Sequence, residues 1–275
     1  MMRSALLAAS VLSTSTVSAG SYDWNMGNVT LYHSLNTYCR PDTYEDRNYK
    51  GVLEGFVPTY SIYDKDHDTR GYVGYHAGQE TIYVAFRGSS SIQNWIDELD
   101  VVTTDYPLCA DCAVHKGFYK AEQSCFNDVL NEVKSLQSKY PSYAVMTTGH
   151  SLGAALALLT AMDLTHSGVN NVKLWNYGSP RVGNTEFANY VDTYIADHHR
   201  VTHHKDMVPH TPMHERFTHI DGEWYQPADD LVIQECFGNE DDNCSYQWHF
   251  TSIQDHLYYL GLHLGASEEN CVAFI

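Results

Sequence analysis

The sequence predicts an α/β fold in which helices flank a mostly parallel central sheet. Short apolar runs typical of buried strands alternate with helical patterns between residues 118 and 203, and this alternation is typical of a parallel sheet. The continuous apolar run 81–86 indicates a strand at the centre of that sheet. We find no linker, internal repeat or low-complexity tract, so we expect residues 20–275 to form a single domain.

The first 19 residues have the pattern of a signal peptide. Arg3 supplies a positive charge, residues 4–12 form a short apolar stretch, and residues 17–19 (VSA) are a small-residue cleavage signal. The apolar stretch is too short to span a bilayer, and no later run approaches the length of a transmembrane helix. We therefore expect a secreted, extracellular protein without a transmembrane segment.

Charge and cysteine content narrow the possible environments. The formal net charge is −18 at pH 7, and so acidic a chain lacks the basic face that nucleic-acid binding requires. Seven cysteines fit an oxidising compartment. A C-x-x-C pair in a loop after Pro107 favours a local disulfide over a redox pair. We expect three disulfides, Cys109–Cys112, Cys236–Cys244 and Cys39–Cys271. The remaining cysteine, Cys125, is expected to be a buried free thiol.

The N-terminal third is predicted to contain a helix and three strands. Apolar residues at helical spacing indicate a helix over 29–38, and strands are expected at 57–63, 71–78 and 81–86. The acidic turn 64–68 lacks the glycine and glutamate of a calcium loop at the sixth and twelfth positions, so we interpret it as a hairpin turn. Glycosylation sequons begin at Asn28 and Asn243.

A short amphipathic helix follows the central strand. Its apolar residues fall at i, i+3, i+4 and i+7 and are Ile92, Trp95, Ile96 and Leu99. The pattern fits an ordinary surface helix packed on the core. It also fits a mobile lid whose apolar face covers a site in water and meets lipid when open. So short a helix between serine-rich and acidic loops is only marginally stable alone.

The alternation of helices and strands then continues along the chain. We expect a long amphipathic helix over 118–140 that ends at Pro141, a strand at 143–147 and an apolar helix at 154–164. The same patterns predict a strand at 172–178, a loop at 179–184, a helix at 185–196 and a strand at 198–203.

Residues 149–153, with the sequence GHSLG, match G-x-S-x-G between a strand pattern and a helix pattern. This is the context that a nucleophile elbow requires. The sharp turn needs small neighbours, which Gly149 and Gly153 supply. Such a turn exposes the Ser151 hydroxyl and leaves the Leu152 amide at a helix N-terminus, where it can stabilise an oxyanion. We therefore predict Ser151 to be a catalytic nucleophile.

A serine hydroxyl is a poor nucleophile at neutral pH and needs a histidine base oriented by a carboxylate. In the chain order Ser, acid, His, the acid follows Ser151 and lies just past a strand, as Asp206 does. The last two histidines are His256 and His263, and spacing favours His256 only modestly. Other candidates for the acid are Asp192, Asp197, Asp229, Asp230 and Asp255.

The histidine-rich stretch 198–219 does not have the spacing of a metal site. His214 and His219 would lie about 140° apart on an α-helix, and Pro212 disfavours a regular helix between His210 and His214. We expect neither a metal site nor an organic cofactor.

Six motifs spread over the chain point to one family. They are VAFRGS at 84–89, SIQNWI at 91–96, TGHSLGAA at 148–155, YGSPRVGN at 177–184, VTHHKDMVP at 201–209 and HLYYLG at 256–261. With them, the chain resembles the secreted class 3 lipases of filamentous fungi, a family that includes a feruloyl esterase branch. The resemblance covers roughly residues 50–265.

The resemblance implies an α/β-hydrolase fold with Ser151 as nucleophile, Asp206 as orienting acid and His256 as base. It implies that Ser89 stabilises the oxyanion together with the Leu152 amide. It also implies that the helix 92–99 is a lid with Trp95 on its lipid-facing side. The three expected disulfides match bridges of the family.

These expectations together predict a secreted triacylglycerol lipase that cleaves lipid esters at an oil–water interface through an acyl-enzyme. Contact with the lipid surface is expected to be transient and made through the lid, and the protein is expected to be a monomer. A feruloyl or aryl esterase, and a phospholipase or galactolipase of the same family, remain alternatives. The apolar lid helix favours the lipase. A non-catalytic lipid-binding protein is disfavoured by the complete set of catalytic residues.

Overall fold

The structure, a computed structural model, describes residues 21–39, 44, 45, 47–213, 215–228 and 230–264. The main sheet has the strand order β1-β2-β3-β6-β7-β8-β9-β10. Neighbouring strands from β3 to β9 are parallel, whereas β1, β2 and β10 pair in the antiparallel sense at the two edges. The predicted α/β class with a mostly parallel sheet is confirmed. The strands span Phe56–Asp64 (β1), Thr69–His76 (β2), Thr81–Phe86 (β3), Ala144–His150 (β6), Val172–Tyr177 (β7), His198–His203 (β8), Glu223–Gln226 (β9) and Gln234–Glu235 (β10).

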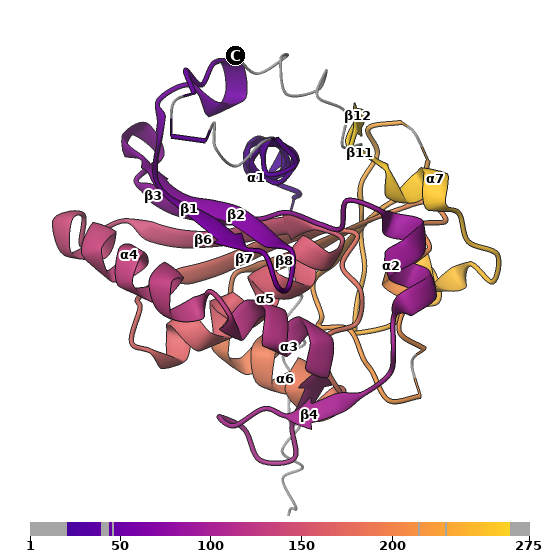
Figure 1. Cartoon of the computed structure of the whole chain (residues 1–275). Coiled ribbons are helices and arrows are strands. Elements are labelled where there is room, and N and C mark those ends of the chain that lie inside the picture. The colour runs from indigo at the N-terminus through magenta and orange to yellow at the C-terminus, as the bar shows by residue number, and fades with distance from the viewer. Residues whose placement is uncertain (1–20, 40–43, 46, 214, 229, 265–275) are drawn as a thin grey trace, which may run out of the picture.

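Helices cover both faces of this sheet (Figure 1). One face packs against α1, and the opposite face packs against α4 and α5, with α3 and α6 outside α5. Each face has its own cluster of buried apolar side chains. β3 lies between the two clusters and buries all six of its side chains, which confirms the predicted central strand. The helices span Trp24–Asn36 (α1), Lys116–Gln123 (α3), Phe126–Lys139 (α4), Leu152–His166 (α5) and Thr185–Tyr194 (α6).

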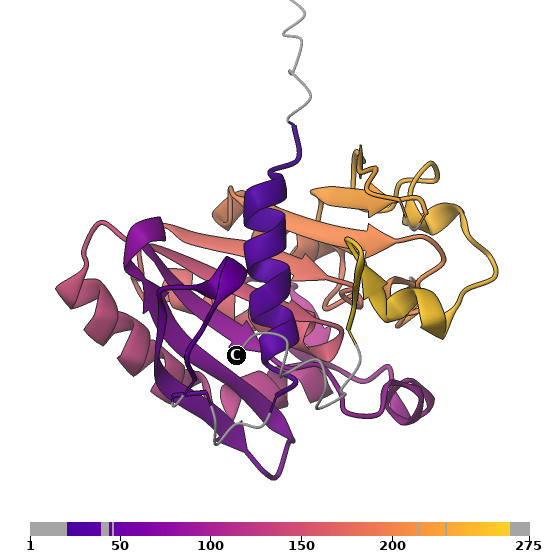
Figure 2. The same cartoon turned by 90° about the horizontal axis from the view of Figure 1, so that it is seen from above.

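Two short helices stand apart from these layers, at the edge of the sheet where its parallel strands end. They are α2 (Ile92–Glu98) and α7 (Ile253–His256), which lie at the same end of the molecule (Figure 2). Two two-stranded ribbons lie outside the main sheet: β4 (Thr103–Asp105) with β5 (Ala113–His115), and β11 (Tyr258–Tyr259) with β12 (Leu262–His263). Four single-turn 3₁₀ helices also occur in the described residues, at Gly51–Leu53, Ala77–Gln79, Val208–His210 and Ser245–Gln247. Carboxyl ends of parallel strands are where α/β folds place their sites.

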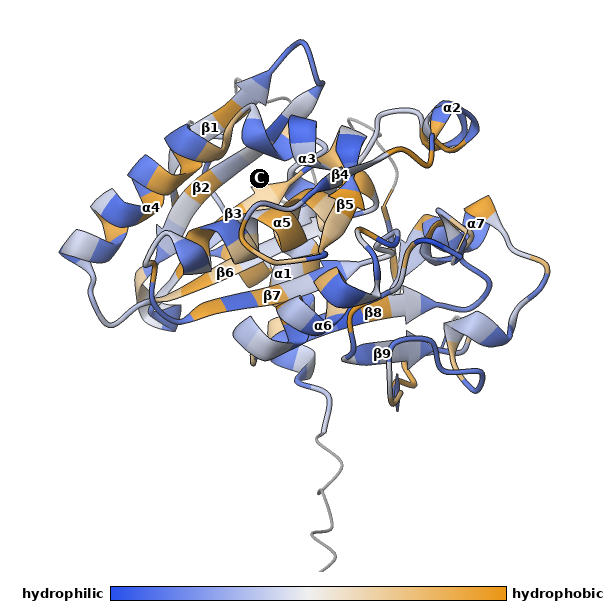
Figure 3. Ribbon diagram, turned by 90° about the horizontal axis from the view of Figure 1, so that it is seen from below, coloured by the Kyte–Doolittle hydropathy of each residue, from blue (hydrophilic) through white to orange (hydrophobic). Residues whose placement is uncertain are grey.

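The predicted long helix over 118–140 is wrong, because the chain forms two helices there. α3 ends at Gln123, and Cys125 has the non-helical angles φ −123° and ψ −6° before α4 begins. The Ser124 hydroxyl donates to the Ala121 carbonyl at 2.8 Å, which offers the backbone an alternative to continuing the helix. The amphipathic stripe was identified correctly, and α4 alternates between apolar and polar residues along its length (Figure 3).

α1 begins five residues earlier than the predicted start at residue 29. Asp23 explains the difference, because its carboxylate accepts hydrogen bonds from the Asn25 and Met26 amides at 3.0 Å and so caps the helix. The acidic turn after β1 is the predicted hairpin turn. There the Asp64 carboxylate accepts from the Asp66 amide at 2.7 Å, the geometry of an Asx turn.

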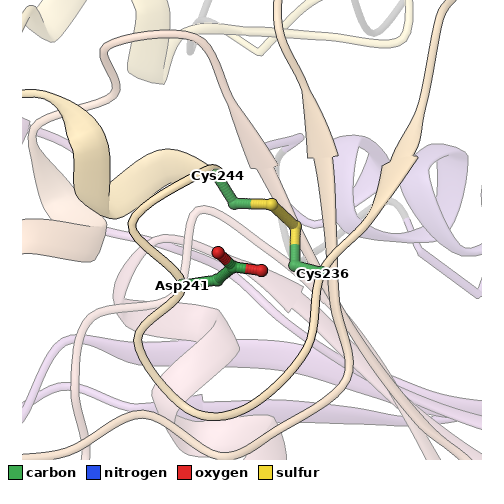
Figure 4. A group of neighbouring side chains, drawn as sticks. All are labelled: Cys236, Asp241 and Cys244. Carbon is green, nitrogen blue, oxygen red and sulfur yellow. A yellow bond between two sulfur atoms is a disulfide. The ribbon is translucent and has the colours of Figure 1, made fainter.

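Two of the three expected disulfides lie within the described residues, and both are present: Cys109–Cys112 and Cys236–Cys244. Cys39 is also disulfide-bonded, but Cys271 and the predicted signal peptide, residues 1–19, lie outside the described residues. Cys125 is a buried free thiol, as expected. Asp241 lies beside the Cys236–Cys244 bond (Figure 4). Since those sulfur atoms are bonded to each other, the three side chains do not offer the thiolates of a metal site.

The two sequons differ in exposure. Asn28 is half-buried within α1, whereas Asn243 is exposed in the loop that the Cys236–Cys244 disulfide closes. Glycosylation at either site stays a prediction. None of the helices in the described part of the chain has the length and apolar character needed to cross a membrane.

Candidate active site

Ser151 occupies a sharp turn between β6 and α5. Its backbone angles are φ 62° and ψ −130°, in a region that side chains rarely adopt. The strand ends at His150 and the helix begins at Leu152, so the Leu152 amide lies at the N-terminus of α5. The Ser151 side chain is buried, and its Oγ has no hydrogen-bond partner.

The glycines around this turn are required by space. A Cβ added to Gly149 would lie 2.3 Å from the Gly153 carbonyl oxygen, and one added to Gly153 would lie 2.3 Å from the Phe86 carbonyl oxygen. The helix therefore approaches both β6 and β3 more closely than any larger residue permits. The structure confirms the predicted strand–turn–helix context of the G-x-S-x-G motif.

Asp206 and His256 meet in the interior beside this turn. The His256 Nδ1 lies 2.9 Å from the Asp206 Oδ2, and both side chains are buried. The other carboxylate oxygen, Oδ1, accepts from the Val208 amide at 2.8 Å. With Nδ1–H donating to the carboxylate, His256 presents the lone pair of its Nε2, a buried atom without a hydrogen-bond partner. This is the protonation pattern of a general base.

Backbone contacts hold the segments of these two residues together, although they are far apart in sequence. Asp206 lies in the turn after β8, and its backbone forms a parallel bridge with Ser252. Ser252 donates to the Lys205 carbonyl at 2.7 Å, and its side chain caps α7, the helix that ends with His256. The bridge thus fixes α7 next to the turn that carries Asp206.

The alternative acids have other partners. Asp192 lies 3.4 Å from His198, Asp197 lies 2.7 Å from Lys173, and Asp255 lies 2.9 Å from His204. The Asp230 carbonyl accepts from Gln226, and Asp229 lies outside the described residues. The alternative base, His263, is on the ribbon strand β12. Of the candidate acids, Asp206 is therefore the one that pairs with His256, whose ring stacks on that of His150, the residue before Ser151.

Three residues of the site were not predicted from the sequence. The Tyr259 hydroxyl donates to the same Asp206 oxygen that faces His256. The His150 ring stacks on the His256 ring with centroids 4.4 Å apart, and Tyr38 hydrogen-bonds to His150. Burial, followed by the neighbouring His256, holds the pKa of His150 well below its usual value. His150 lies inside the GHSLG motif, but that position accepts any residue and so gave no signal.

Ser89 lies in the turn after β3, directly after Gly88. A Cβ added to the preceding Gly88 would lie only 3.0 Å from the Ser151 Cβ. The Ser89 hydroxyl donates to the Ser91 carbonyl at 3.2 Å, so in this conformation it is bonded within its own loop. The predicted oxyanion donor thus directly follows a residue that approaches Ser151, its role stays a prediction, and Ser91 immediately precedes α2.

The predicted lid, α2, is weakly anchored. None of its residues is buried, and its N-terminus has no side-chain cap. Its apolar side faces the protein, where Trp95 stacks on Phe118 of α3 with ring centroids 6.1 Å apart. In this conformation Trp95 is therefore turned towards α3. The helix has few contacts to lose if it moves.

The comparisons with known proteins agree with this geometry. Residues 83–216 match the family model described as lipase (class 3). A lipase of Rhizomucor miehei is 37% identical over 86% of this chain and 69% of that protein. Secreted mono- and diacylglycerol lipase A of Penicillium cyclopium is 36% identical over 58% of this chain, which spans about half (52%) of that relative's length.

Solved structures extend the likeness to the whole fold. One solved structure is that of a triacylglycerol lipase whose catalytic centre is described as a serine protease triad, and it matches the present structure with a TM-score of 0.83. It covers 90% of this chain and 98% of that one at 35% identity. The α/β-hydrolase architecture, the elbow at Ser151 and the likeness along most of the chain lead to one conclusion: the protein belongs to the class 3 lipase family.

Proposed function

We propose that this protein is a secreted lipase that hydrolyses carboxylic esters of lipids, triacylglycerols among them, through an acyl-enzyme on Ser151. The observation that carries the proposal is the pair of buried, unpartnered atoms, the Ser151 Oγ and the His256 Nε2, beside an Asp206 carboxylate bonded to the His256 Nδ1. Native proteins rarely leave buried polar atoms unpaired, and active sites are one reason for exceptions.

In the proposed reaction, His256 Nε2 takes the Ser151 proton while Oγ attacks the ester carbonyl. The Leu152 amide and the Ser89 hydroxyl stabilise the oxyanion that forms, and Asp206 stabilises the imidazolium. His256 then gives its proton to the leaving alcohol, which leaves the acyl group on Ser151. A water molecule deprotonated by His256 attacks this acyl-enzyme, releases the fatty acid and restores the serine.

The lid completes the proposal. Since the Ser89 hydroxyl is bonded to Ser91 at the start of α2, movement of α2 would release that hydroxyl to face the oxyanion. The same movement would expose the side of α2 that carries Ile92, Trp95, Ile96 and Leu99 to lipid. We therefore propose that α2 opens at an oil–water interface and that the contact with lipid is transient. A secreted monomer is sufficient for this mechanism.

Replacement of Ser151 by alanine tests the chemistry. We expect Ser151→Ala to lower turnover of emulsified triolein by several orders of magnitude while the fold survives. Ser34→Ala is the matched control, because it removes another buried serine hydroxyl, one that bonds to Thr148 beneath α1. Near-normal activity of the Ser151 variant would overturn the proposal. Faster turnover of methyl ferulate than of triolein by the native protein would instead assign an aryl esterase.

A further inference from the structure

Two hydrogen bonds lead from Tyr38, which lies against the turn beside Ser151, to the backbone of His256. The Gly88 backbone packs closely against the Tyr38 hydroxyl. That hydroxyl lies 2.7 Å from the His150 Nδ1, and the His150 Nε2 lies 2.8 Å from the His256 carbonyl oxygen. These contacts therefore connect the β3 turn, the segment after α1, the end of β6 and the end of α7.

The His256 carbonyl and the neutral His150 ring fix the direction of these two bonds. The His256 carbonyl can only accept, so the His150 Nε2 must carry a proton. Because burial keeps the His150 ring neutral, its Nδ1 carries a lone pair, and the Tyr38 hydroxyl donates to it. Burial raises the pKa of the Tyr38 hydroxyl, which keeps it a donor at any working pH. His150 is thus held neutral and in a single tautomer.

Space around these two hydrogen bonds is equally constrained. A Cβ added to Gly88 would lie 2.2 Å from the Tyr38 hydroxyl oxygen and 2.7 Å from the His150 carbonyl oxygen. The His150 ring is fully buried against the His256 ring, at an interplanar angle of 28°. His150 therefore contacts His256 twice, through the ring face and through the backbone carbonyl.

These contacts stabilise α7, which is too short a helix to be held by its own hydrogen bonds. α7 has only four residues, Ile253–His256, and a helix leaves its last carbonyls without partners inside the helix. His150 supplies a partner for the last of them. Because His150 directly precedes Ser151, this bond also ties the position of the imidazole to the strand that carries the nucleophile.

We propose that Tyr38 and His150 are positioning residues that hold the His256 imidazole in line with Ser151 and couple it to the Gly88–Ser89 turn. The inference rests on the proposed catalytic roles of Ser151 and His256. A neutral His150 matters because the reaction creates an imidazolium on His256. A second positive charge 4.4 Å away would oppose that step.

The first test compares two tyrosines of the same N-terminal region. Tyr44 is also buried, and its hydroxyl donates to the Thr37 and Cys39 carbonyls at 2.5 and 3.1 Å, away from the site. Both Tyr38→Phe and Tyr44→Phe should lower the melting temperature. We expect only Tyr38→Phe to lower kcat, by roughly tenfold, with KM within about twofold, as is typical for residues that orient a reacting group. Equal kcat values for the two variants would overturn the inference.

The second test uses two amides at position 150. The amide of Gln matches the reach of the ring Nε2 and can still donate to the His256 carbonyl, whereas the amide of Asn reaches only as far as Nδ1. Both variants lose the ring stacking equally. We expect His150→Gln to keep a kcat roughly tenfold higher than His150→Asn, and equal kcat values would contradict the proposal. If Tyr38→Phe does not fold, the comparison of His150→Gln with His150→Asn tests the proposal without it.

The His256→Ala variant separates failure of this inference from failure of the proposed function. If His256→Ala loses activity while Tyr38→Phe and both His150 variants keep it, only the positioning roles are wrong. If His256→Ala itself stays active, the proposed mechanism fails.

Discussion

The Ser151 Oγ and the His256 Nε2 are buried without partners, at a cost in stability that an ordinary core would avoid. The third member of the set, Asp206, is instead fully bonded. It accepts from Val208, from His256 and from Tyr259, the last two on a single oxygen. At the scale of single residues, the site therefore combines a rigidly held carboxylate with two atoms kept available for reaction.

Tyr259 should tune the acid–base behaviour of this set. Its hydroxyl competes with His256 for the negative charge on the Asp206 Oδ2, so Tyr259→Phe leaves that charge to the imidazole alone. An imidazolium is then better stabilised, and the acid limb of the kcat/KM profile should move to higher pH by roughly half a unit. The measurement is a pH–rate profile on a soluble short-chain ester. A shift of the acid limb to lower pH, or a lower maximal kcat/KM with the acid limb unmoved, would contradict this reasoning.

At the scale of elements, α2 and α7 differ from the helices packed on the sheet. The long α5 buries every residue from Gly153 to Leu164 and is a rigid support for the elbow. α2 buries none of its residues, and α7 has only four residues, held by the Asp206–Ser252 bridge and by His150. The nucleophile thus stands on the most buried helix, whereas the lid is among the least anchored elements.

The Trp95–Phe118 contact is the main aromatic contact of the lid. Trp95→Ala should destabilise the closed position of α2, because the stacking on Phe118 is lost. We expect activity on a short-chain triglyceride below its solubility limit to rise severalfold, and the jump at that limit to shrink. Trp24→Ala, at the start of α1, is the control for loss of a partly exposed tryptophan. An undiminished jump in the Trp95 variant would show that this contact does not hold the lid.

At the scale of the whole molecule, a buried pair of carboxyl groups makes the stability of the folded protein depend on pH. Glu122 of α3 and Asp163 of α5 share Gln123, which donates to both carboxylates at 2.9 and 2.7 Å. Burial, followed by the charge of Asp163, raises the pKa of Glu122 well above its usual value, and burial also raises the pKa of Asp163. The folded state therefore binds protons more tightly than the unfolded chain. The stability from this pair is complete below the ordinary carboxyl pKa and falls as pH rises through the raised values.

Glu122→Gln should remove the loss of folding stability that this acidic pair causes at high pH. We expect the variant to melt several degrees above the native protein at pH 8, and this difference to shrink as the pH falls towards 5. The exposed Glu54→Gln is the control, for which no pH-dependent difference is expected. Thermal unfolding across this pH range provides the measurement. A difference that grows towards acid pH would refute the assigned sign.

The sequence by itself determined the fold class, the elbow at Ser151, the central strand, the amphipathic α2 and two disulfides. Each depends on residues close together in the chain, where periodicity, turn chemistry and spacing act locally. The residues alone left five other aspartates open beside Asp206, which only the family resemblance singled out, and the tertiary structure decided that Asp206 faces His256. It also placed Tyr38, His150 and Tyr259 around the site and interrupted the helix at Cys125. The reason is physical: the Tyr38–His150 and His150–His256 bonds join residues 112 and 106 positions apart, and contacts at such separations arise from packing, which leaves no local pattern.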